Sequence, residues 1–120
     1  MDKPAKKIEI YSEERPWGSF TTFAKNELTT VKLITVNAGE AFSLQSHKNR
    51  AEFWRVISGN GIITVGEVKE TIQVGADYEI PPETLHRVEA GSEAVLILEV
   101  SRGDFDEEDI VRAEDKYGRT

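Results

Sequence analysis

The sequence of 120 residues predicts a single all-β domain, built as a sandwich or barrel. From Phe20 onward, short runs rich in β-branched and aromatic residues are separated by glycine, asparagine and acidic turns. The length is enough for one conventional hydrophobic core and too short for two domains. Because the chain has no cysteine, disulfides and thiolate ligands are excluded, and stability must come from packing and hydrogen bonds.

The N-terminal end differs from the rest of the chain. Residues 1–14 mix charges with an Ile8/Ile10 alternation, so we expect a loose N-terminal extension that adds an edge strand. The single domain then covers residues 15–120. Trp17 lies between a proline and a glycine, and we interpret its side chain as a plug packed against the body of the domain rather than as a ligand-stacking residue.

The β-rich runs are expected to form strands in the order in which they occur. They are Phe20–Ala24, Thr29–Val36, Glu52–Ile57, Ile62–Val65, Thr71–Val74, Tyr78–Ile80, Arg87–Ala90 and Val95–Val100. The sequence Gly59-Asn60-Gly61 predicts a hairpin, because glycine and asparagine tolerate positive φ.

Alternation along these runs assigns side chains to faces. Lys32 shares a face with Ile34, and the alternation alone leaves open whether this face is the interior, where a lysine would need an anionic partner or a substrate. In the later run, Glu52 shares a face with Trp54 and Val56. This pattern predicts a metal ligand at a cavity mouth above a packed core. Phe53 belongs to the opposite face.

The chain end has a different pattern. The segment from Asp104 to Ile110 opens with acidic residues, which suit a helix N-terminus, so we expect a short C-terminal helical segment there. Its ordinary interpretation is a solvated, charged end segment.

Two stretches carry the residues suited to a metal site. Gln45 and His47 lie two residues apart, so on a strand they share a face, and Glu52 follows; His86 lies in the second stretch, after two prolines. One amide oxygen, two imidazoles and one carboxylate suit zinc, iron, manganese, cobalt or nickel better than calcium or magnesium. A lone histidine is more often structural, but both histidines of the chain fall at these spacings.

These spacings resemble the two cupin motifs. Gly39 to Gly59 is similar to the first motif, with Gln45 in place of its first histidine. Gly75 to His86 is similar to the second motif, with Glu83 in place of a glycine. The resemblance implies a cupin double-stranded β-helix, that is, a jelly-roll barrel.

A narrower resemblance is to the cupin domain of type II phosphomannose isomerases, often fused behind a mannose-1-phosphate guanylyltransferase. It spans Arg15 to Arg119, nearly the whole chain. Its runs are Arg15–Gly18, Phe42–His47, Arg50–Trp54, Ile80-Pro81 with His86-Arg87, and Glu107–Arg112 followed by Asp115, Tyr117, Gly118 and Arg119. The resemblance implies that Lys32 points into the barrel and that the tail folds back across its mouth.

The resemblance also implies a function: a metal-dependent sugar-phosphate aldose–ketose isomerase, interconverting mannose 6-phosphate and fructose 6-phosphate. One divalent ion, zinc foremost, would polarise the C1 and C2 oxygens of the substrate while a base moves the carbon-bound proton. Arg50 and Lys32 are the expected catalytic residues, and Lys32, Arg50 and Arg87 the expected substrate contacts. Lys48, Asn49 and Phe53 depart from the histidine-rich stretch common in the fused enzymes.

Two other functions stay open. One is a non-catalytic, metal-containing cupin that binds a sugar or small anion as a sensor or accessory module, with the metal as a structural or orienting element. The other is a metal-dependent oxygenase, which the replacement of a histidine by Gln45 disfavours. The net charge of −7 argues against nucleic acid and an anionic membrane as partners. We expect a cytoplasmic protein, with a small sugar phosphate as ligand, and a homodimer by analogy with other cupins.

Overall fold

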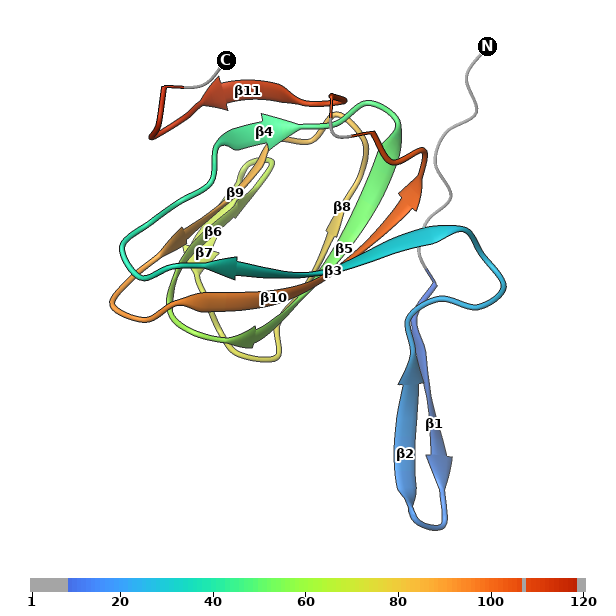
Figure 1. The fold of residues 1–120 in the computed structure, drawn as a ribbon. Coiled ribbons are helices and arrows are strands. Elements are labelled where there is room, and N and C mark those ends of the chain that lie inside the picture. Colours follow the sequence, from blue (N-terminus) through green and yellow to red (C-terminus); the bar gives the residue numbers. More distant parts are fainter. Residues whose placement is uncertain (1–8, 107, 119–120) are drawn as a thin grey trace.

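The computed structural model describes residues 9–106 and 108–118, and shows a barrel of two facing sheets with a projecting hairpin (Figure 1). The strands are β1 (Tyr11–Arg15), β2 (Gly18–Thr22), β3 (Thr29–Val36), β4 (Leu44–Ser46), β5 (Arg50–Ser58), β6 (Gly61–Val65), β7 (Val68–Thr71), β8 (Asp77–Ile80), β9 (His86–Ala90), β10 (Val95–Gly103) and β11 (Val111–Glu114). Within the described ranges there is no helix, and hence none that could cross a membrane.

The chain passes repeatedly from one sheet to the other. One sheet has the strand order β3-β10-β5-β8, the other has the order β11-β4-β9-β6-β7, and all pairs are antiparallel. From β3 to β11, every connection except the β6–β7 hairpin therefore crosses between the sheets. This winding confirms the predicted all-β jelly-roll barrel.

The core lies between the two sheets. Trp54 and Val56 of β5 are 1% exposed, and Ile63, Val88 and Ile97 from three other strands are fully buried beside them. The predicted inward face of the run after Glu52 is therefore confirmed, and it places a buried carboxylate directly next to the apolar core.

A smaller cluster lies on the outer face of the four-stranded sheet. Phe53 is 3% exposed and packs with Val100 against Ile10 and Phe23, which belong to the segments that flank the N-terminal hairpin. Phe53 thus points away from the barrel interior, as its place in the alternation predicted. The side chain at position 53 therefore does not line the inner face.

The predicted and observed strand bounds agree best where apolar and polar residues alternate over a long run. β3 has the predicted bounds, and Lys32 does share its inward face with Ile34. The structure contains two strands that were not predicted, β4 and β11. β7 lies earlier than predicted, because it ends at Thr71, where the predicted strand Thr71–Val74 begins. β1 starts at Tyr11, within the expected extension, but it pairs with β2 in a separate two-stranded sheet, so it does not add the expected edge strand to the barrel. Ile8 lies outside the described residues.

The sequence Gly59-Asn60-Gly61 does not form the predicted hairpin. β5 and β6, which it connects, belong to different sheets, so this segment is a crossover. The glycines are needed for close approach: a Cβ on Gly59 would lie 2.2 Å from the Ala94 oxygen, and one on Gly61 would lie 2.0 Å from the Glu89 oxygen. The hairpin prediction was correct about backbone freedom and wrong about strand pairing.

Two further predictions are wrong. The described residues from Asp104 to Ile110 are turns and irregular chain rather than a helix, because tertiary hydrogen bonds to the 47–49 turn engage their polar groups. Trp17 is 74% exposed at the turn of the β1–β2 hairpin, so its side chain is not packed against the body of the domain.

Candidate metal centre

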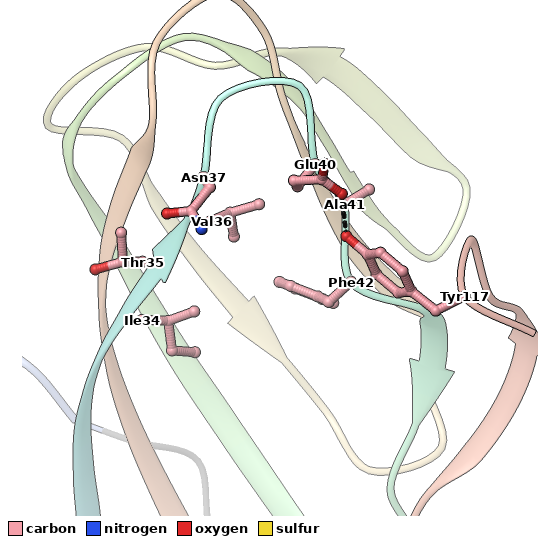
Figure 2. Close-up of a pocket in the computed structure, with 8 residues that line it drawn as sticks. All are labelled: Ile34, Thr35, Val36, Asn37, Glu40, Ala41, Phe42 and Tyr117. Atoms are coloured by element: carbon pink, nitrogen blue, oxygen red, sulfur yellow. Dashed lines mark hydrogen bonds between the residues drawn. The ribbon is translucent and has the colours of Figure 1, made fainter. Parts of the chain in front are cut away.

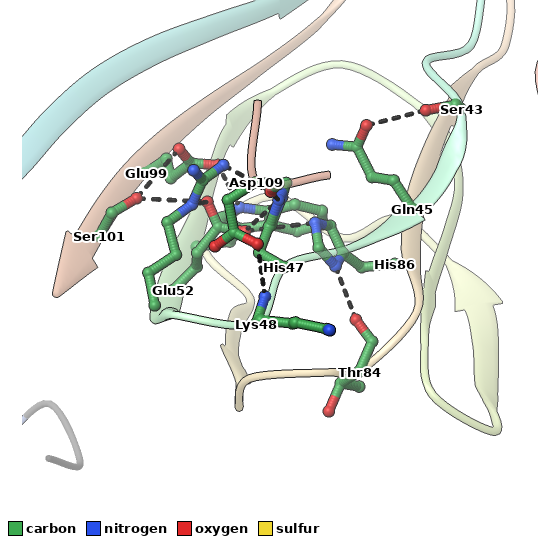
Figure 3. Close-up of polar contacts among 12 residues, drawn as sticks. Ser43, Gln45, His47, Lys48, Glu52, Thr84, His86, Glu99, Ser101 and Asp109 are labelled. Atoms are coloured by element: carbon green, nitrogen blue, oxygen red, sulfur yellow. Dashed lines mark hydrogen bonds and ion pairs between the residues drawn. The ribbon is translucent and has the colours of Figure 1, made fainter. Parts of the chain in front are cut away.

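Three side chains from separate parts of the chain converge inside the barrel (Figure 3). His47 follows β4, Glu52 lies on β5 and His86 begins β9, and one ligating atom from each lies within 4.8 Å of the others. Glu52 Oε1 is 3.2 Å from His86 Nε2 and 3.6 Å from His47 Nε2. All three side chains are buried, so their donor atoms face one another rather than solvent.

Hydrogen bonds to main-chain oxygens orient both imidazoles. His47 Nδ1 donates to the Asp109 oxygen at 2.6 Å, and His86 Nδ1 donates to the Thr84 oxygen at 2.9 Å. Because a carbonyl oxygen can only accept, each Nδ1 carries a proton, and in the neutral imidazole the Nε2 lone pair then faces Glu52. This is the arrangement that histidine ligands of metals adopt.

The residues present fit a divalent cation. Glu52 Oε1 and His86 Nε2 are both buried and neither makes a hydrogen bond, although they lie close together. A shared cation would satisfy both atoms, and two imidazoles with one carboxylate are donors suited to zinc and similar ions. His47, Glu52 and His86 would then be its ligands.

Burial acts on the charges of this cluster. Burial alone would raise the pKa of Glu52, but the neighbouring His86, Glu99 and His47 side chains outweigh it and lower the pKa well below its ordinary value. Burial lowers the pKa of His47, with smaller opposing contributions from Asp109 and Glu52. The cluster therefore favours an ionised carboxylate and a neutral imidazole, the forms that bind metal.

A second buried carboxylate lies beside the first. Strand register pairs Glu99 with Trp54 and Ser101 with Glu52 across β10 and β5. Trp54 Nε1 donates to Glu99 Oε2 at 3.0 Å, while the Ser101 hydroxyl lies 3.2 Å from Glu52 Oε2 and 3.3 Å from Glu99 Oε1. Burial, and then the charge of Glu52, raise the pKa of Glu99. The pair thus combines one carboxylate held ionised with one that favours its protonated form.

Two cationic side chains and one ring lie at the rim of the cluster. Arg50 Nη2 donates to His47 Nε2 at 3.1 Å, and its Nε is 3.5 Å from Glu52 Oε2. The Phe105 ring is contacted by both cations, with Lys32 Nζ 4.1 Å and Arg50 Cζ 4.3 Å from its centroid. Ligation of an ion by His47 Nε2 would replace the hydrogen bond from Arg50.

The C-terminal segment closes over this rim. Asp109 accepts hydrogen bonds from the main-chain nitrogens of Lys48 and Asn49, both at 2.9 Å, and the Asp106 oxygen accepts one from Arg50. The segment after β10 therefore does fold back across the barrel mouth, as the resemblance implied, although it is not helical.

Gln45 lies next to the cluster, but its side-chain oxygen points away from it. Its backbone is paired with that of His86, but its Oε1 accepts a hydrogen bond from Ser43 at 2.8 Å and points away from the three ligands (Figure 3). Ligation by Gln45 would require the terminal amide to turn so that Oε1 replaces Nε2.

Arg87, the third expected substrate contact, is held elsewhere. It follows His86 on β9 and so points to the opposite face of the sheet. Its Nε donates to the Phe42 oxygen at 3.0 Å, and its Nη atoms lie 3.3 Å from two oxygens of Glu114. The structure brings Lys32 and Arg50 to the cluster, whereas Arg87 attaches β11 to the barrel.

A separate cavity of about 250 Å³ opens at the edge of β3 (Figure 2). It is lined by Ile34, Thr35, Val36, Asn37, Glu40, Ala41, Phe42 and Tyr117. Glu40 accepts hydrogen bonds from the Tyr117 hydroxyl and, at 2.9 Å, from Lys116 Nζ. The Phe42 ring packs edge-on against Trp54, which packs in turn against His86, so these rings lie between the cavity and the metal cluster.

The family is decided by comparison of the whole sequence. The model of the family described as "Mannose-6-phosphate isomerase C-terminal" matches residues 3–115. The chain belongs to this family.

Curated relatives of this chain are much longer proteins. It is 40% identical over 108 residues to the xanthan biosynthesis protein XanB of Xanthomonas campestris, covering 88% of this chain. It is 40% identical over 114 residues to the mannose-1-phosphate guanylyltransferase ManC of Salmonella typhimurium, covering 92% of this chain. The chain spans 23% of the length of each of these relatives.

Solved structures agree with the barrel. The capsular polysaccharide assembling protein CapF from Staphylococcus aureus matches with a TM-score of 0.65 at 19% identity, over 88% of this chain and 33% of that one. A cupin 2 conserved barrel domain protein from Rhodopseudomonas palustris matches with a TM-score of 0.61 at 21% identity, over 83% of this chain and 74% of that one. At such identities the likeness shows the fold alone, and that fold is the cupin barrel.

The sequence did not predict four residues that contact the cluster or its rim: Glu99, Ser101, Phe105 and Asp109. The first two had a detectable signal, since they continue the inward face of β10 after Ile97 and are polar where that face is otherwise apolar. The other two belong to the segment expected to be helical, and only the fold brings them to the barrel mouth.

Proposed function

We propose that this chain is a metal-dependent aldose–ketose isomerase that acts on a sugar phosphate, with mannose 6-phosphate and fructose 6-phosphate as the expected pair. The observation that carries the proposal is the convergence of His47, Glu52 and His86, with both Nδ1 atoms engaged and the Nε2 atoms turned toward one carboxylate oxygen. The names of the family and of its relatives support a role in mannose-related biosynthesis.

The proposed ion is zinc, with manganese, cobalt, nickel or iron as alternatives; His47, Glu52 and His86 would hold it, and Gln45 would be a fourth ligand once its amide had turned. When bound, the ion would act as a Lewis acid that polarises the adjacent C1 and C2 oxygens of the sugar. The isomerisation transfers one proton from C2 to C1 and one from O2 to O1, so atoms and charge balance without a further reactant.

Arg50 and Lys32 stabilise negative charge in this proposal. Arg50 already lies within hydrogen-bonding distance of a ligand nitrogen, so its guanidinium can reach substrate oxygens at the cluster. Both cations contact the Phe105 ring at the mouth, which places two positive charges where the phosphate of a substrate would enter. Arg87 stays a prediction as a phosphate contact, because it would first have to release Glu114.

Glu99 is the proposed proton-transfer group. It is 5% exposed, it lies in register beside Lys32 on one side and Trp54 on the other, and its raised pKa suits a group that takes up and returns a proton near neutral pH. Glu52 is unsuited to that role, since its pKa is lowered and its carboxylate is needed by the ion.

One experiment tests the proposal directly. The protein, expected in the cytoplasm, is loaded with zinc or manganese, and exchange of the C2 proton of mannose 6-phosphate with deuterated solvent is followed by NMR. Exchange in the loaded wild type and its loss in His86→Ala would support the isomerase. Absence of exchange with every metal, on this and related aldose phosphates, would overturn it.

A second candidate is a non-catalytic module that binds a sugar or small anion. One observation favours it: Arg50 donates to His47 Nε2, the atom that an ion would need, while Phe105 contacts both rim cations. Such a metal-containing module would bind sugar phosphates without exchanging the C2 proton, so the same NMR samples separate the two functions.

A further inference from the structure

The cavity at the edge of β3 takes no part in the proposed reaction. Its apolar wall includes Ile34, Val36 and Phe42, which also pack on the core, and its volume is about 250 Å³. Sites for drug-sized ligands enclose roughly 300–1,000 Å³, so this cavity suits a small ligand built on one ring. The Phe42 and Trp54 rings separate it from the metal cluster.

The turn that forms the opposite wall is fixed by main-chain hydrogen bonds. The Gly39 nitrogen donates to the Gly91 oxygen at 2.9 Å. The Ala90 nitrogen donates to the Glu40 oxygen, also at 2.9 Å. Gly39 has a φ of 76°, in the left-handed region that favours glycine. The wall is therefore formed before any ligand arrives, and binding costs little ordering of the chain.

Polar groups lie at the rim of the cavity (Figure 2). Within the described part of the chain, Glu40 is the only charged side chain that lines it. The Tyr117 hydroxyl and Lys116 Nζ both donate to Glu40 Oε2, the amine at 2.9 Å. Glu40 Oε1 accepts no hydrogen bond from the residues that the structure describes, so it is available to a ligand. The exposed Asn37 side chain offers one more acceptor and two donor hydrogens.

These groups favour an uncharged ligand with several hydroxyls. Glu40 would repel a phosphate, and it attracts a cationic ligand only weakly because Lys116 already pairs with it. Hydroxyl groups can donate to Glu40 Oε1 and can both donate to and accept from the Asn37 amide. The C–H face of a saturated ring can pack on the aromatic rings of Phe42 and Tyr117. A hexose ring combines the two properties.

We propose that this cavity binds a neutral, unphosphorylated hexose at a second site, separate from the metal centre. The apolar wall and the Tyr117 ring contact the faces of the sugar, while Glu40 and Asn37 bind its hydroxyls. None of these residues is a proposed metal ligand or a proposed catalytic group. The site therefore does not depend on the proposed isomerase.

NMR titration of ¹⁵N-labelled protein with D-mannose, D-glucose and D-galactose tests the proposal. With at least one of the three, the amide signals of residues 37–42 and of Tyr117 should shift saturably, and those of Lys48 and Asn49 beside the metal cluster should not. His47→Ala, which removes a proposed metal ligand, should bind the hexose with an unchanged dissociation constant. Loss of isomerase activity and loss of this site are thereby distinguished.

Two variants test the residues of the site. Glu40→Gln removes the charged acceptor and Tyr117→Ala removes one ring, and each should raise the dissociation constant about tenfold or more. Glu70→Gln is the matched control and should leave it unchanged, because Glu70 also accepts a hydrogen bond from a tyrosine, Tyr78, but does not line the cavity.

Tyr117 is 55% exposed near the chain end, so Tyr117→Ala still decides if Glu40→Gln fails to fold. The absence of saturable shifts with all three hexoses would overturn the proposal. Shifts confined to the metal cluster, or equal dissociation constants for the wild type and Tyr117→Ala, would overturn it too.

Discussion

The main-chain oxygen of Asp109 accepts a hydrogen bond from His47 Nδ1 at 2.6 Å, although 62 positions separate the two residues. The contact sets the tautomer of the imidazole and directs Nε2 to Glu52. The Asp109 carboxylate adds two hydrogen bonds to the turn after His47. A residue near the chain end thus holds one of the proposed metal ligands in place.

Replacing Asp109 should therefore weaken metal binding more than it weakens the fold. Asp109→Ala removes the two carboxylate contacts that hold the turn, and loss of support of this kind typically costs about 10–100-fold in metal affinity. Zinc affinity is measured by competition with a chelator, and stability by urea unfolding. Glu108→Ala, in the same segment and exposed, is the control and should leave the affinity unchanged. Equal affinities for the two variants would contradict the role of Asp109.

The proposed ligands should differ in their importance. His47→Ala and His86→Ala each remove an imidazole whose Nε2 faces Glu52, so purified protein should lose nearly all of its metal. Gln45→Ala should lose only part of it, because the Gln45 oxygen is bonded to Ser43 and must turn to reach an ion. Elemental analysis of the three variants checks this order. A near-complete loss of metal in Gln45→Ala would contradict it.

Metal retention should persist to unusually low pH. Metal ligands must be deprotonated, and burial lowers the pKa of His47 below its ordinary value of 6.5, while the pKa of Glu52 is lowered too. On acidification, both groups therefore stay in their metal-binding forms below the range in which exposed histidines protonate. Zinc release into a colorimetric dye, followed from neutral to acidic pH, should have its midpoint below 6.5. A midpoint above that value would show that His47 is not protected.

Glu99 should make the metal-free protein less stable as pH rises. Its folded-state pKa is raised from 4.5 to about 7, so the unfolded chain loses this proton first, and stability falls by at most about 1.4 kcal/mol per pH unit across that window. Glu52 acts in the opposite sense and only below its ordinary value, where its stabilising contribution is lost as pH falls. Urea unfolding at several pH values from 5 to 7 should therefore show a flatter profile for Glu99→Gln than for the wild type. Parallel profiles would contradict the raised pKa.

The sequence predicted the fold where the pattern is local. The run Thr29–Val36 gave the bounds of β3, and its alternation placed Lys32 on the same face as Ile34, because side chains alternate between the two faces of an ordinary strand. Alternation left open which face is the inner one, and the family resemblance implied the inward direction of Lys32. It could not predict the pairing around Gly59 and Gly61, since the same backbone freedom serves a hairpin or a close crossover.

The site was predictable to the extent that it lies in the two motifs. His47, Glu52 and His86 come together as their spacing indicated, and Arg50 lies beside them. The support from Asp109 depends on a contact across 62 positions, which no local pattern encodes. The acidic start of that segment suggested a helix, but its polar groups are engaged by the turn after His47 instead.

Arg50 should matter more for turnover than for binding. Its guanidinium reaches the ligand nitrogen of His47 and lies over Phe105, so in the proposed reaction it can stabilise charge that develops on substrate oxygens near the ion. Removal of one such donor typically costs about 10²–10³-fold in turnover. Arg50→Ala should show that loss in C2-proton exchange, with a much smaller change in sugar-phosphate affinity measured by calorimetry. Arg55→Ala, on the opposite face of the same strand and paired with Asp77, should change neither quantity. Lost affinity in Arg50→Ala with turnover at saturating substrate unchanged would mean that Arg50 binds substrate and transition state alike, and this result would contradict its proposed catalytic role.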